Sequence, residues 1–450
     1  MRSLLTISAT VLEVERRQPA ENFILKVQRK VEGTVMLFHI LNNHEKPEIR
    51  QMAAVLVRRK LASHWTRIPS AEQTAIKATL LHVIVNDSSS SVRNSAAVVA
   101  GALSRVLLPL GQWNDLLPFL QQAATSTQAD LRDASMLILQ YMAEFMASLL
   151  VKSLASLAPI LDTILRGQSH PVATLRAMRV VEKLLGAAYD DVDNDDGSAA
   201  SEDVSISSQY LSVLVAGLFA ATEGFLARGD FDSANEALSV IADAVEEDPK
   251  AIPLPELFTL ILRIMQAPYQ GAGAVPARLR YSASSSVFAI LEYRPKALLK
   301  CRGVVEQLVE TAFSLVSVGA NRSPEQELLE DEAADDMVGD DEMEDERTSL
   351  GFASGGLGCQ ILDMMATTLP ATNLAPLVFP RIEEAVRSNQ PTAQWTAITS
   401  LGSLIEGLQE TFRVFIHQLV DMLVTVFASG NGQLVGACCY CLGQILEHLY

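Results

Sequence analysis

The sequence predicts an all-α protein built as an α-solenoid of HEAT repeats, and three observations carry this prediction. A short phrase returns about every forty residues: a hydrophobic residue, often Arg next, then small apolar residues. Long stretches rich in Ala, Leu, Val and Gln place apolar residues at helical spacing. Sequence runs typical of β-strands are nearly absent. Stacked pairs of helices are the architecture that a period of this size indicates.

The period can be followed on the hydrophobic residue of each phrase. Four of the five intervals between these residues are 39 to 45 residues long, and the fifth is 61 residues long. HEAT and armadillo repeats have periods of roughly 40–47 residues, so four intervals agree with them. The long interval contains an acidic insertion. The residues are Ile49, Val92, Leu131, Ala173, Ala234 and Leu279.

Each repeat is predicted to contain a first helix and a second helix, and the phrase opens the second. Prolines stand at several expected helix starts, where their missing N–H group leaves no intrahelical bond unmade. Asp and Asn precede several second helices in the position of N-caps. A leader over 1–20, expected to be disordered, and a partial helix over 21–31 precede an array of about nine pairs within 21–450. The predicted pairs are 31–41 with 47–63, 70–85 with 90–107, 112–124 with 129–147, 151–166 with 171–188, 205–227 with 231–246, 253–266 with 276–292, 295–318 with 351–369, 373–388 with 390–408, and 412–429 with 433–449.

Two blocks of acidic residues account for the net charge of −18. Residues 325–346 contain thirteen Asp and Glu, residues 190–203 contain seven, and neither block contains Lys or Arg. Dense like charges repel one another, so we expect both blocks to be unfolded interaction loops. A solvated insertion explains the shorter block equally well, whereas the longer block needs a function within a compact array. The rest of the chain is nearly neutral and has no basic stripe, which argues against nucleic-acid binding.

Two stretches carry a resemblance to a known family. PEIRQMAAVLVRRKLASHW, which contains Arg58, Arg59 and Lys60, resembles the second repeat of importin-β superfamily receptors. YRPKALLKCRGVVEQLVETAFSLVS, followed by the long acidic block and CQILDMMATTLP, resembles the eighth repeat of the importin-4 branch of that superfamily. In this family an acidic loop joins the two helices of the eighth repeat. The long acidic block lies within the seventh predicted pair. This pair becomes the eighth repeat when the partial helix over 21–31 is counted as the remnant of a first repeat.

The resemblance implies a nuclear import receptor that works by binding and is not an enzyme. Such receptors bind Ran-GTP with their N-terminal repeats and acidic loop, carry basic cargo through its nuclear localisation signals, and cross the pore on phenylalanine-glycine nucleoporins. Core histones and ribosomal proteins are the cargo that the importin-4 branch implies. We expect a monomer that occupies cytoplasm and nucleus, including the nuclear pore. The alternative is a general HEAT scaffold, such as a phosphatase scaffold subunit, although that class lacks a long acidic loop at this position.

The arginines of the phrase have a structural interpretation. Arg50, Arg93 and Arg132 stand where HEAT repeats bond to an Asp or a carbonyl of a neighbouring repeat. We therefore expect these three to form a ladder rather than to bind a partner.

Other charged residues of the second helices are candidate partner contacts. Guanidinium groups suit bidentate contacts with carboxylates, and the basic cluster after Val57 lies outside the ladder position. The predicted Ran or partner contacts are Arg58, Arg59, Lys60, Asp133 and Glu144.

The long acidic block should attract basic ligands electrostatically. We expect it to contact either Ran or a basic cargo. Its predicted contact residues are Glu330, Asp331, Glu332, Asp335, Asp336, Asp340, Asp341, Glu342, Glu344, Asp345 and Glu346.

Nucleoporin repeats dock in apolar slots between first helices in the family that the chain resembles. Apolar residues on predicted first helices are candidate linings, although such residues are more often inter-helix core. The candidates are Leu154, Leu157, Phe219 and Phe258.

No catalytic, cofactor or metal site is predicted. Cys438 and Cys441 share one face of a helix, but no second Cys or His pair stands at zinc spacing, so we expect buried thiols. An odd number of cysteines, five, argues for a reducing compartment. The seven histidines have no recurring partner.

The two ends look unfinished as a repeat array. Solenoids close with a polar capping repeat, whereas this sequence stops at QILEHLY within an apolar helix. We therefore expect the last pair to expose a hydrophobic face, and we expect the C-terminal repeats of a longer receptor to be missing. No apolar run is expected to reach the roughly 18–20 residues of a membrane span.

Overall fold

The fold is entirely helical in the part of the chain that the computed structural model describes. This part comprises residue 26 and residues 29–167, 170–193, 201–247, 250–268, 271, 273–320, 356–388 and 390–449, of which 189–193 and 201–208 are described by their backbone alone. No strand occurs among these residues. The predicted all-α fold of HEAT-type repeats is confirmed.

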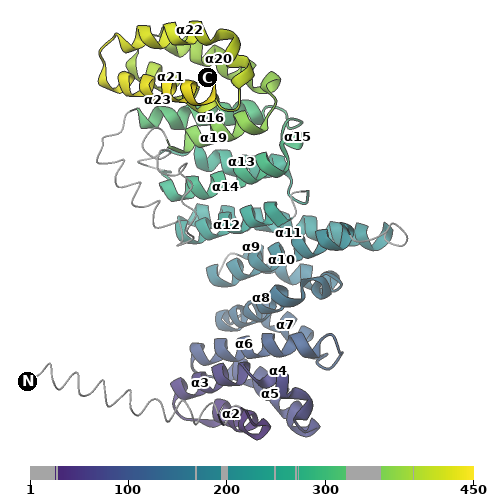
Figure 1. Ribbon diagram of the computed structural model, residues 1–450. Helices are drawn as coiled ribbons and strands as arrows, with labels where there is room; N and C mark the ends of the chain where they lie inside the picture. The colour runs from purple at the N-terminus through teal and green to yellow at the C-terminus, as the bar shows by residue number, and fades with distance from the viewer. Residues whose placement is uncertain are drawn as a thin grey trace, which may run out of the picture. The chain divides into compact units, whose positions relative to one another are not determined.

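The first of two compact units spans residues 1–217. Its helices are α2 (Val31–Asn43), α3 (Pro47–Arg58), α4 (Leu61–His64), the short 3₁₀ helix η1 (Trp65–Arg67), α5 (Ser70–Asn86), α6 (Ser90–Leu107), α7 (Leu116–Ala124), α8 (Ala129–Val151), α9 (Leu154–Gly167) and α10 (Pro171–Asp193). The second helices form one layer, in which α3 packs on α6, α6 on α8 and α8 on α10 (Figure 1). The first helices α2, α5, α7 and α9 each pack against their own second helix.

The second unit spans residues 218–450, and α11 (Ser201–Arg228) crosses the division. Its other helices are α12 (Phe231–Glu247), α13 (Leu254–Met265), α14 (Ala277–Tyr293), α15 (Pro295–Leu298), α16 (Val304–Gly319), α19 (Gly356–Thr368), α20 (Ala371–Arg387), α21 (Pro391–Leu404), α22 (Gln409–Phe427) and α23 (Gly432–His448). The layer of second helices runs in the order α12, α14, α19, α21 and α23, each packed on the next.

Small residues of the recurring phrase let the second helices approach closely. Ala53 and Ala54 of α3 and Ala96 and Ala97 of α6 are at most 2% exposed. A Cβ atom at Gly101 of α6 would lie 2.7 Å from Cβ of Tyr141 in α8, so no larger residue fits at that contact. The phrase therefore encodes the spacing between neighbouring repeats.

Two predicted helices are each broken by a local turn. The helix predicted over 47–63 ends at Arg58, and Lys60 leaves the helical region before α4 begins. The helix predicted over 295–318 is split into α15 and α16, because Gly303 adopts a left-handed conformation with φ of 78°. Only glycine adopts that conformation without strain.

The shorter acidic block is more helical than its charge predicts. We expected 190–203 to be a loop, but α10 continues to Asp193 and α11 begins at Ser201. Helices α10 and α11, which belong to successive pairs, extend into the two ends of the insertion, since helices grow more readily than they start. The longer block, 325–346, lies outside the described residues, as does the leader over 1–20.

Two described helices are long and apolar enough to span a membrane, contrary to the expectation from the sequence. They are α8 and the stretch Gln209–Arg228 of α11. About half of each apolar window is buried, 56% and 50% respectively. Because α8 packs on α6, α7 and α10, its apolar character is explained by the helix stack, and core helices pass the same test.

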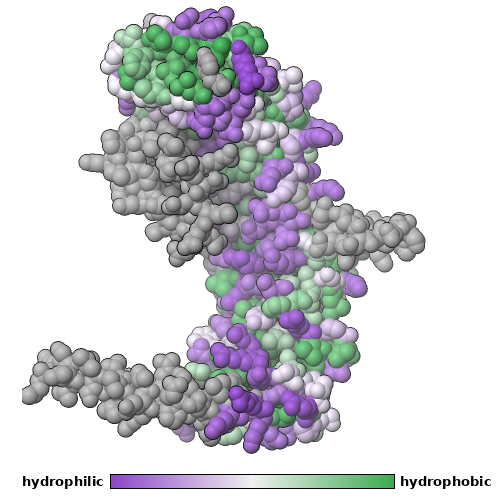
Figure 2. Space-filling model, viewed as in Figure 1, coloured by the Kyte–Doolittle hydropathy of each residue, from purple (hydrophilic) through white to green (hydrophobic). Residues whose placement is uncertain are grey.

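The last helix pair has an exposed apolar face, as expected. Figure 2 shows hydrophobic surface over α22 and α23. The exposed residues are Val414 (75%), Phe415 (50%), Val424 (58%) and Phe427 (45%) of α22, and Leu446 (67%) of α23.

Candidate partner-binding surface

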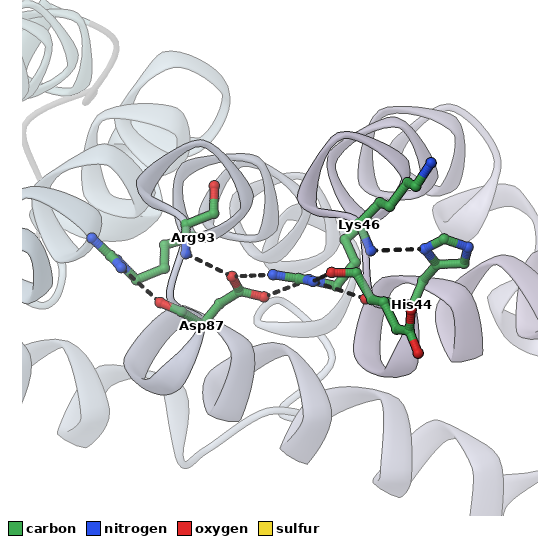
Figure 3. A network of polar contacts seen from close by, with 7 residues as sticks. His44, Lys46, Asp87 and Arg93 are labelled. Atoms are coloured by element: carbon green, nitrogen blue, oxygen red, sulfur yellow. Dashed lines mark hydrogen bonds and ion pairs between the residues drawn. The ribbon is translucent and has the colours of Figure 1, made fainter.

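Arg50 joins two neighbouring repeats through a network around Asp87 (Figure 3). Its Nε and Nη2 atoms donate to the two carboxylate oxygens of Asp87, at 2.9 and 2.8 Å. Its Nη1 donates to the main-chain oxygens of His44 and Glu45, at 2.8 and 3.0 Å. One nearly buried side chain thus fastens the turn before α3 to the turn before α6, as the predicted ladder requires.

The network holds Asp87 in its charged form. Burial by itself would raise the pKa of Asp87, but hydrogen bonds from Arg50 and from the Ser89 N–H, with the charges of Arg50 and Arg93, outweigh it. The pKa of Asp87 is therefore lowered. The pKa of Arg50 is raised, chiefly by its hydrogen bond to Asp87. Both groups are charged at neutral pH, so this is a nearly buried ion pair.

The same position recurs in the next two repeats, because the three arginines are each the fourth residue of their second helix. Arg93 continues the ladder: Nη2 donates to Asp130 at 2.5 Å and Nη1 to the Asp87 carbonyl at 2.6 Å. Arg132 departs from it, since its one hydrogen bond to a described residue joins Nη1 to the Ser126 carbonyl of its own repeat. The ladder is thus confirmed for the first two arginines, and it stops at the third.

Arg280 is a buried arginine at the same helix position as Arg50, Arg93 and Arg132, and the sequence reasoning missed it. It is the fourth residue of α14 and only 1% exposed. Its guanidinium donates to the carbonyls of Val275 and Ala267, at 2.7 and 2.5 Å. It directly follows Leu279, as Arg50, Arg93 and Arg132 follow the hydrophobic residues of their phrases, so the recurring phrase could have found it.

The predicted basic contacts lie together at the end of α3. Arg58 is the last residue of the helix, Arg59 follows it, and Lys60 precedes α4; all three are exposed. Their side chains make no hydrogen bond or ion pair to another described residue. The backbone of the turn is fixed, because the Lys60 N–H donates to the Val57 carbonyl and the Lys60 carbonyl accepts from the His64 N–H, both at 3.0 Å.

His64 anchors this turn to the first helix of the repeat. Its Nδ1 lies 2.8 Å from the Thr34 hydroxyl in α2, and the side chain is buried. Burial lowers the pKa of His64, and the positive charges of Arg67 and Lys60 lower it further. His64 is therefore neutral at pH 7, and the positive charge here belongs to the exposed cluster.

Two further exposed side chains lie at the corresponding ends of α6 and α8. The Arg105 guanidinium lies over the Phe145 ring, 4.8 Å from its centroid, and Phe145 is 49% exposed. The Tyr141 and Phe145 rings are 5.6 Å apart, and α8 departs from helical geometry at Met146 (φ −150°, ψ 34°). The sequence reasoning missed the contact between Arg105 and Phe145, although the spacing of Tyr141 and Phe145 places these two rings on one helix face.

We call Arg58, Arg59, Lys60, Arg105 and Phe145 the C-terminal edge of the second-helix layer. Equivalent helices run in the same direction, because their first turns contact one another through the ladder and their last turns through Arg105 and Phe145. The edge therefore presents four cations and one aromatic ring on three successive repeats. Arg and aromatic residues are the types that dominate binding energy at protein interfaces.

The two predicted acidic contacts lie at opposite ends of α8. Glu144 is exposed and next to Phe145, so it belongs beside the C-terminal edge. Asp133 lies in the first turns, where its carbonyl accepts from Arg176 at 2.8 Å. Burial raises the pKa of Asp133, and its Oδ1 has no hydrogen-bond partner among the described residues. The structure does not bring Asp133 together with the basic cluster.

The four predicted slot residues are core residues. Leu154, Leu157 and Phe258 are at most 2% exposed, and Phe219 is 9% exposed. Each packs among its helix neighbours, so a nucleoporin side chain could reach them only if the helices separated. Their role as slot linings stays a prediction, and any open slot must be lined by more exposed neighbours.

The cysteines have the features of core thiols. All five are free, and Cys438 and Cys441 are buried as expected, while Cys439 between them is exposed. Burial raises the pKa of Cys441 to about 12 and that of Cys359 to about 11, so both stay protonated. No cluster of His, Cys, Asp and Glu that could hold a metal ion occurs among the described residues.

Comparison with known proteins identifies the family. Residues 20–86 match the importin-beta N-terminal domain, and residues 88–252 match the family described as IPO5-like TPR repeats. Importin-4 of Mus musculus is 25% identical over 443 residues, which cover 97% of this chain. The chain belongs to the importin-β superfamily.

This importin-β superfamily chain spans 38% of the length of mouse Importin-4. A second relative, the probable importin subunit beta-4 of Schizosaccharomyces pombe, is 30% identical over 152 residues, or 32% of this chain and 14% of the relative. Among solved structures, Kap121p bound to Nup53p aligns with the whole chain and 41% of its own, at 18% identity and a TM-score of 0.76. Kap121p bound to RanGTP aligns with 92% of the chain and 37% of its own, at 18% identity and a TM-score of 0.68. At this identity, the structural likeness shows the fold alone.

Proposed function

We propose that this chain belongs to a nuclear import receptor that binds Ran-GTP, basic cargo and phenylalanine-glycine nucleoporins, and that it moves between cytoplasm and nucleus. The observation that carries the proposal is the exposed basic cluster Arg58–Lys60 at the C-terminal edge, within the segment that matches the importin-beta N-terminal domain. Kap121p, which has the same fold, has been solved with RanGTP and with Nup53p. Histones and ribosomal proteins are the proposed cargo.

The chemistry of the edge suits an acidic protein surface. Arg58 and Arg59 have guanidinium groups that donate in a planar fork, which matches carboxylates. No described residue neutralises them, so a partner's carboxylates would be their first ion pairs. Phe145 supplies an apolar anchor beside them, and Glu144 adds one acceptor for a basic group of the same partner. Release of cargo follows if Ran and cargo favour different arrangements of the repeats.

Reversing the charge of the basic cluster should weaken Ran binding. We expect Arg58→Glu with Arg59→Glu to lower the affinity for immobilised Ran-GTP by about tenfold or more, because two attractive contacts become repulsive. Biolayer interferometry against Ran-GTP and Ran-GDP measures the effect. The matched control is Lys296→Glu with Lys300→Glu, which reverses two exposed cations of the second unit.

The same measurement separates the two functional classes. A transport receptor binds Ran-GTP more tightly than Ran-GDP, and only the cluster variant should lose this preference. Equal binding of both nucleotide states would instead favour the general HEAT scaffold. An equal loss in the Lys296/Lys300 control would show that total charge, and not the edge, determines binding.

The acidic block 325–346 should strengthen binding of basic ligands. Replacing its thirteen Asp and Glu with Ser and Asn keeps the length and removes the charge. We expect the affinity for a Lys-rich nuclear localisation peptide or for Ran-GTP to fall by about tenfold at 0.15 M salt, with a smaller loss at high salt where charges are screened. Unchanged affinity for both ligands at low salt would exclude the proposed role.

A further inference from the structure

A polar cavity lies where the arginine ladder stops, between the third and fourth helix pairs. Its volume is about 220 Å³, and it opens between the turn joining α7 to α8 and the turn joining α9 to α10. The polar groups of its lining are Thr125, Ser126, Arg132, Thr163, His170 and Thr174. All of these belong to the first unit.

The cavity stands at the position that a carboxylate fills in the two preceding repeats. Arg50 and Arg93, the fourth residues of their helices, each bind an aspartate of the next repeat, Asp87 and Asp130. Arg132 is the fourth residue of α8 and points into the same kind of turn, but no described carboxylate pairs with it. At the third position of the ladder, Arg132 therefore faces the cavity, and no carboxylate of a described residue pairs with it.

The sequence explains the missing anion. Asp87 stands three residues before the start of its helix, and Asp130 is the second residue of its helix. The corresponding residues around the start of α10 are Gln168 and Val172, neither of which can carry a negative charge. His170 lines the cavity in this turn.

The donors around the cavity are only partly used. The hydroxyls of Thr125, Thr163 and Thr174 each donate to a carbonyl of their own helix or turn. Arg132 uses Nη1 for the Ser126 carbonyl, and its other N–H groups make no hydrogen bond to a described residue. The guanidinium therefore retains the donors that bind aspartate in the preceding repeats.

The nearby acids do not fill this role. Asp130 is paired with Arg93, and Asp162 with Arg166 at 2.7 Å. Asp133 is near Arg132, His170 and Arg176, but it does not line the cavity and forms no hydrogen bond or ion pair with Arg132. An added carboxylate would meet the unused N–H groups of Arg132 and the imidazole of His170.

We propose that this cavity binds an acidic side chain of a protein partner, whose carboxylate takes the place that Asp87 and Asp130 hold in the preceding repeats. A space of about 220 Å³ admits an Asp or Glu side chain with part of its backbone, and more than one free oxyanion would be needed to fill it. The partner's acid would pair with the fork of Arg132. The site is independent of the C-terminal edge, which lies at the other end of the second helices.

The first test supplies the missing carboxylate from the chain itself. Val172 is 49% exposed, so Val172→Asp places a carboxylate where Asp130 stands in the repeat before, without disturbing the core. We expect Val172→Asp to raise the Tm of the full chain by about 1–2 °C, and Arg132→Gln to abolish that gain in the double variant. The same gain in the Arg132→Gln background would overturn the proposed geometry.

The second test measures the ligand. The full chain with ¹³C-labelled histidine is titrated with a Glu-rich decapeptide and, separately, with inorganic phosphate at constant ionic strength. We expect a saturable shift of the His170 signal with the peptide, lost in both Arg132→Gln and Val172→Asp, and at least about tenfold weaker binding of phosphate. A peptide shift that persists in both variants, no peptide shift, or phosphate binding as tight as the peptide would each overturn the assignment.

Discussion

Replacing Arg50 with alanine is expected to lower the free energy of unfolding of the first unit by about 3 kcal/mol, because it leaves a nearly buried carboxylate without its counter-ion. Asp87 would lose both donors from the guanidinium and keep only the Ser89 N–H at 2.9 Å. The carbonyls of His44 and Glu45 would lose their donor as well. The loss therefore combines a broken ion pair with an unfastened turn.

Urea denaturation followed by tryptophan fluorescence measures this effect. Trp65 and Trp113 are both buried in the first unit, at 3% and 2% exposure, so their emission reports its unfolding. A Trp395→Phe background removes the third tryptophan, which lies in the second unit. The matched control is Arg166→Ala, which removes a half-exposed pair with Asp162 within one helix and should cost only about 0.3–0.5 kcal/mol.

The effect of Arg50 should depend on pH in a defined direction. The folded pKa of Asp87 is below its unfolded value, so the stability that it contributes is present above the unfolded pKa of about 3.9 and is lost as pH falls through the folded pKa. The difference between the wild type and Arg50→Ala should shrink below about pH 4. A difference that stays constant down to pH 2, or a loss no larger than that of Arg166→Ala, would contradict the ion-pair explanation.

The helix pairs could be predicted from the sequence because their determinants are local. The expected helix 90–107 agrees with α6, and 70–85 differs from α5 by one residue. Proline at a helix start, the spacing of apolar residues and the recurring phrase all act within one or two turns of helix. The breaks at Lys60 and Gly303 were missed because a single backbone conformation ends each helix, and the surrounding residues favour helix on both sides.

The candidate surface could be predicted only in part. Arg58, Arg59 and Lys60 are neighbours in the sequence, so their cluster is visible there. The pair of Arg105 and Phe145 joins two repeats, and it is apparent only when the register of α6 against α8 is known.

The position of Arg280 is visible in the recurring phrase, where it follows Leu279, but its hydrogen-bond acceptors are not. Its acceptors are backbone carbonyls, which every residue has and no sequence pattern marks. The missing third carboxylate of the ladder also became visible only after the first two pairs were located in space.

Replacing Gly407 with alanine should lower the free energy of unfolding of the second unit by at least as much as Arg50→Ala lowers that of the first unit. Gly407 lies in the turn between α21 and α22, against the last turn of α19. An added Cβ would lie 2.5 Å from the Thr367 nitrogen and would overlap the carbonyl group of Ala366. These are backbone atoms that cannot rotate away, so α19 and the turn must separate. We expect the free energy of unfolding to fall by about 3 kcal/mol, which is at the upper end of the destabilisation that overpacking a core causes.

Hydrogen exchange measured by mass spectrometry locates this effect. Peptides from α19 and α21 of Gly407→Ala should exchange faster, because both helices would open at lower free energy. Gly443→Ala is the matched control, since Gly443 lies within α23 and an added Cβ meets no atom within 4 Å. That substitution should leave exchange unchanged or slow it, as alanine favours helix over glycine by about 1 kcal/mol.

The two glycine variants distinguish close packing from chain flexibility. Alanine restricts the unfolded chain equally at both positions. If hydrogen exchange becomes faster in one variant and slower in the other, the difference must therefore come from the folded state. Equal exchange in Gly407→Ala and wild type would mean that the turn moves away from α19 without cost, and the close approach of these repeats would then not be needed for stability. Faster exchange confined to α19 and α21, with α13 and α14 unaffected, would show that neighbouring repeats open separately, as expected when each repeat contacts only the next.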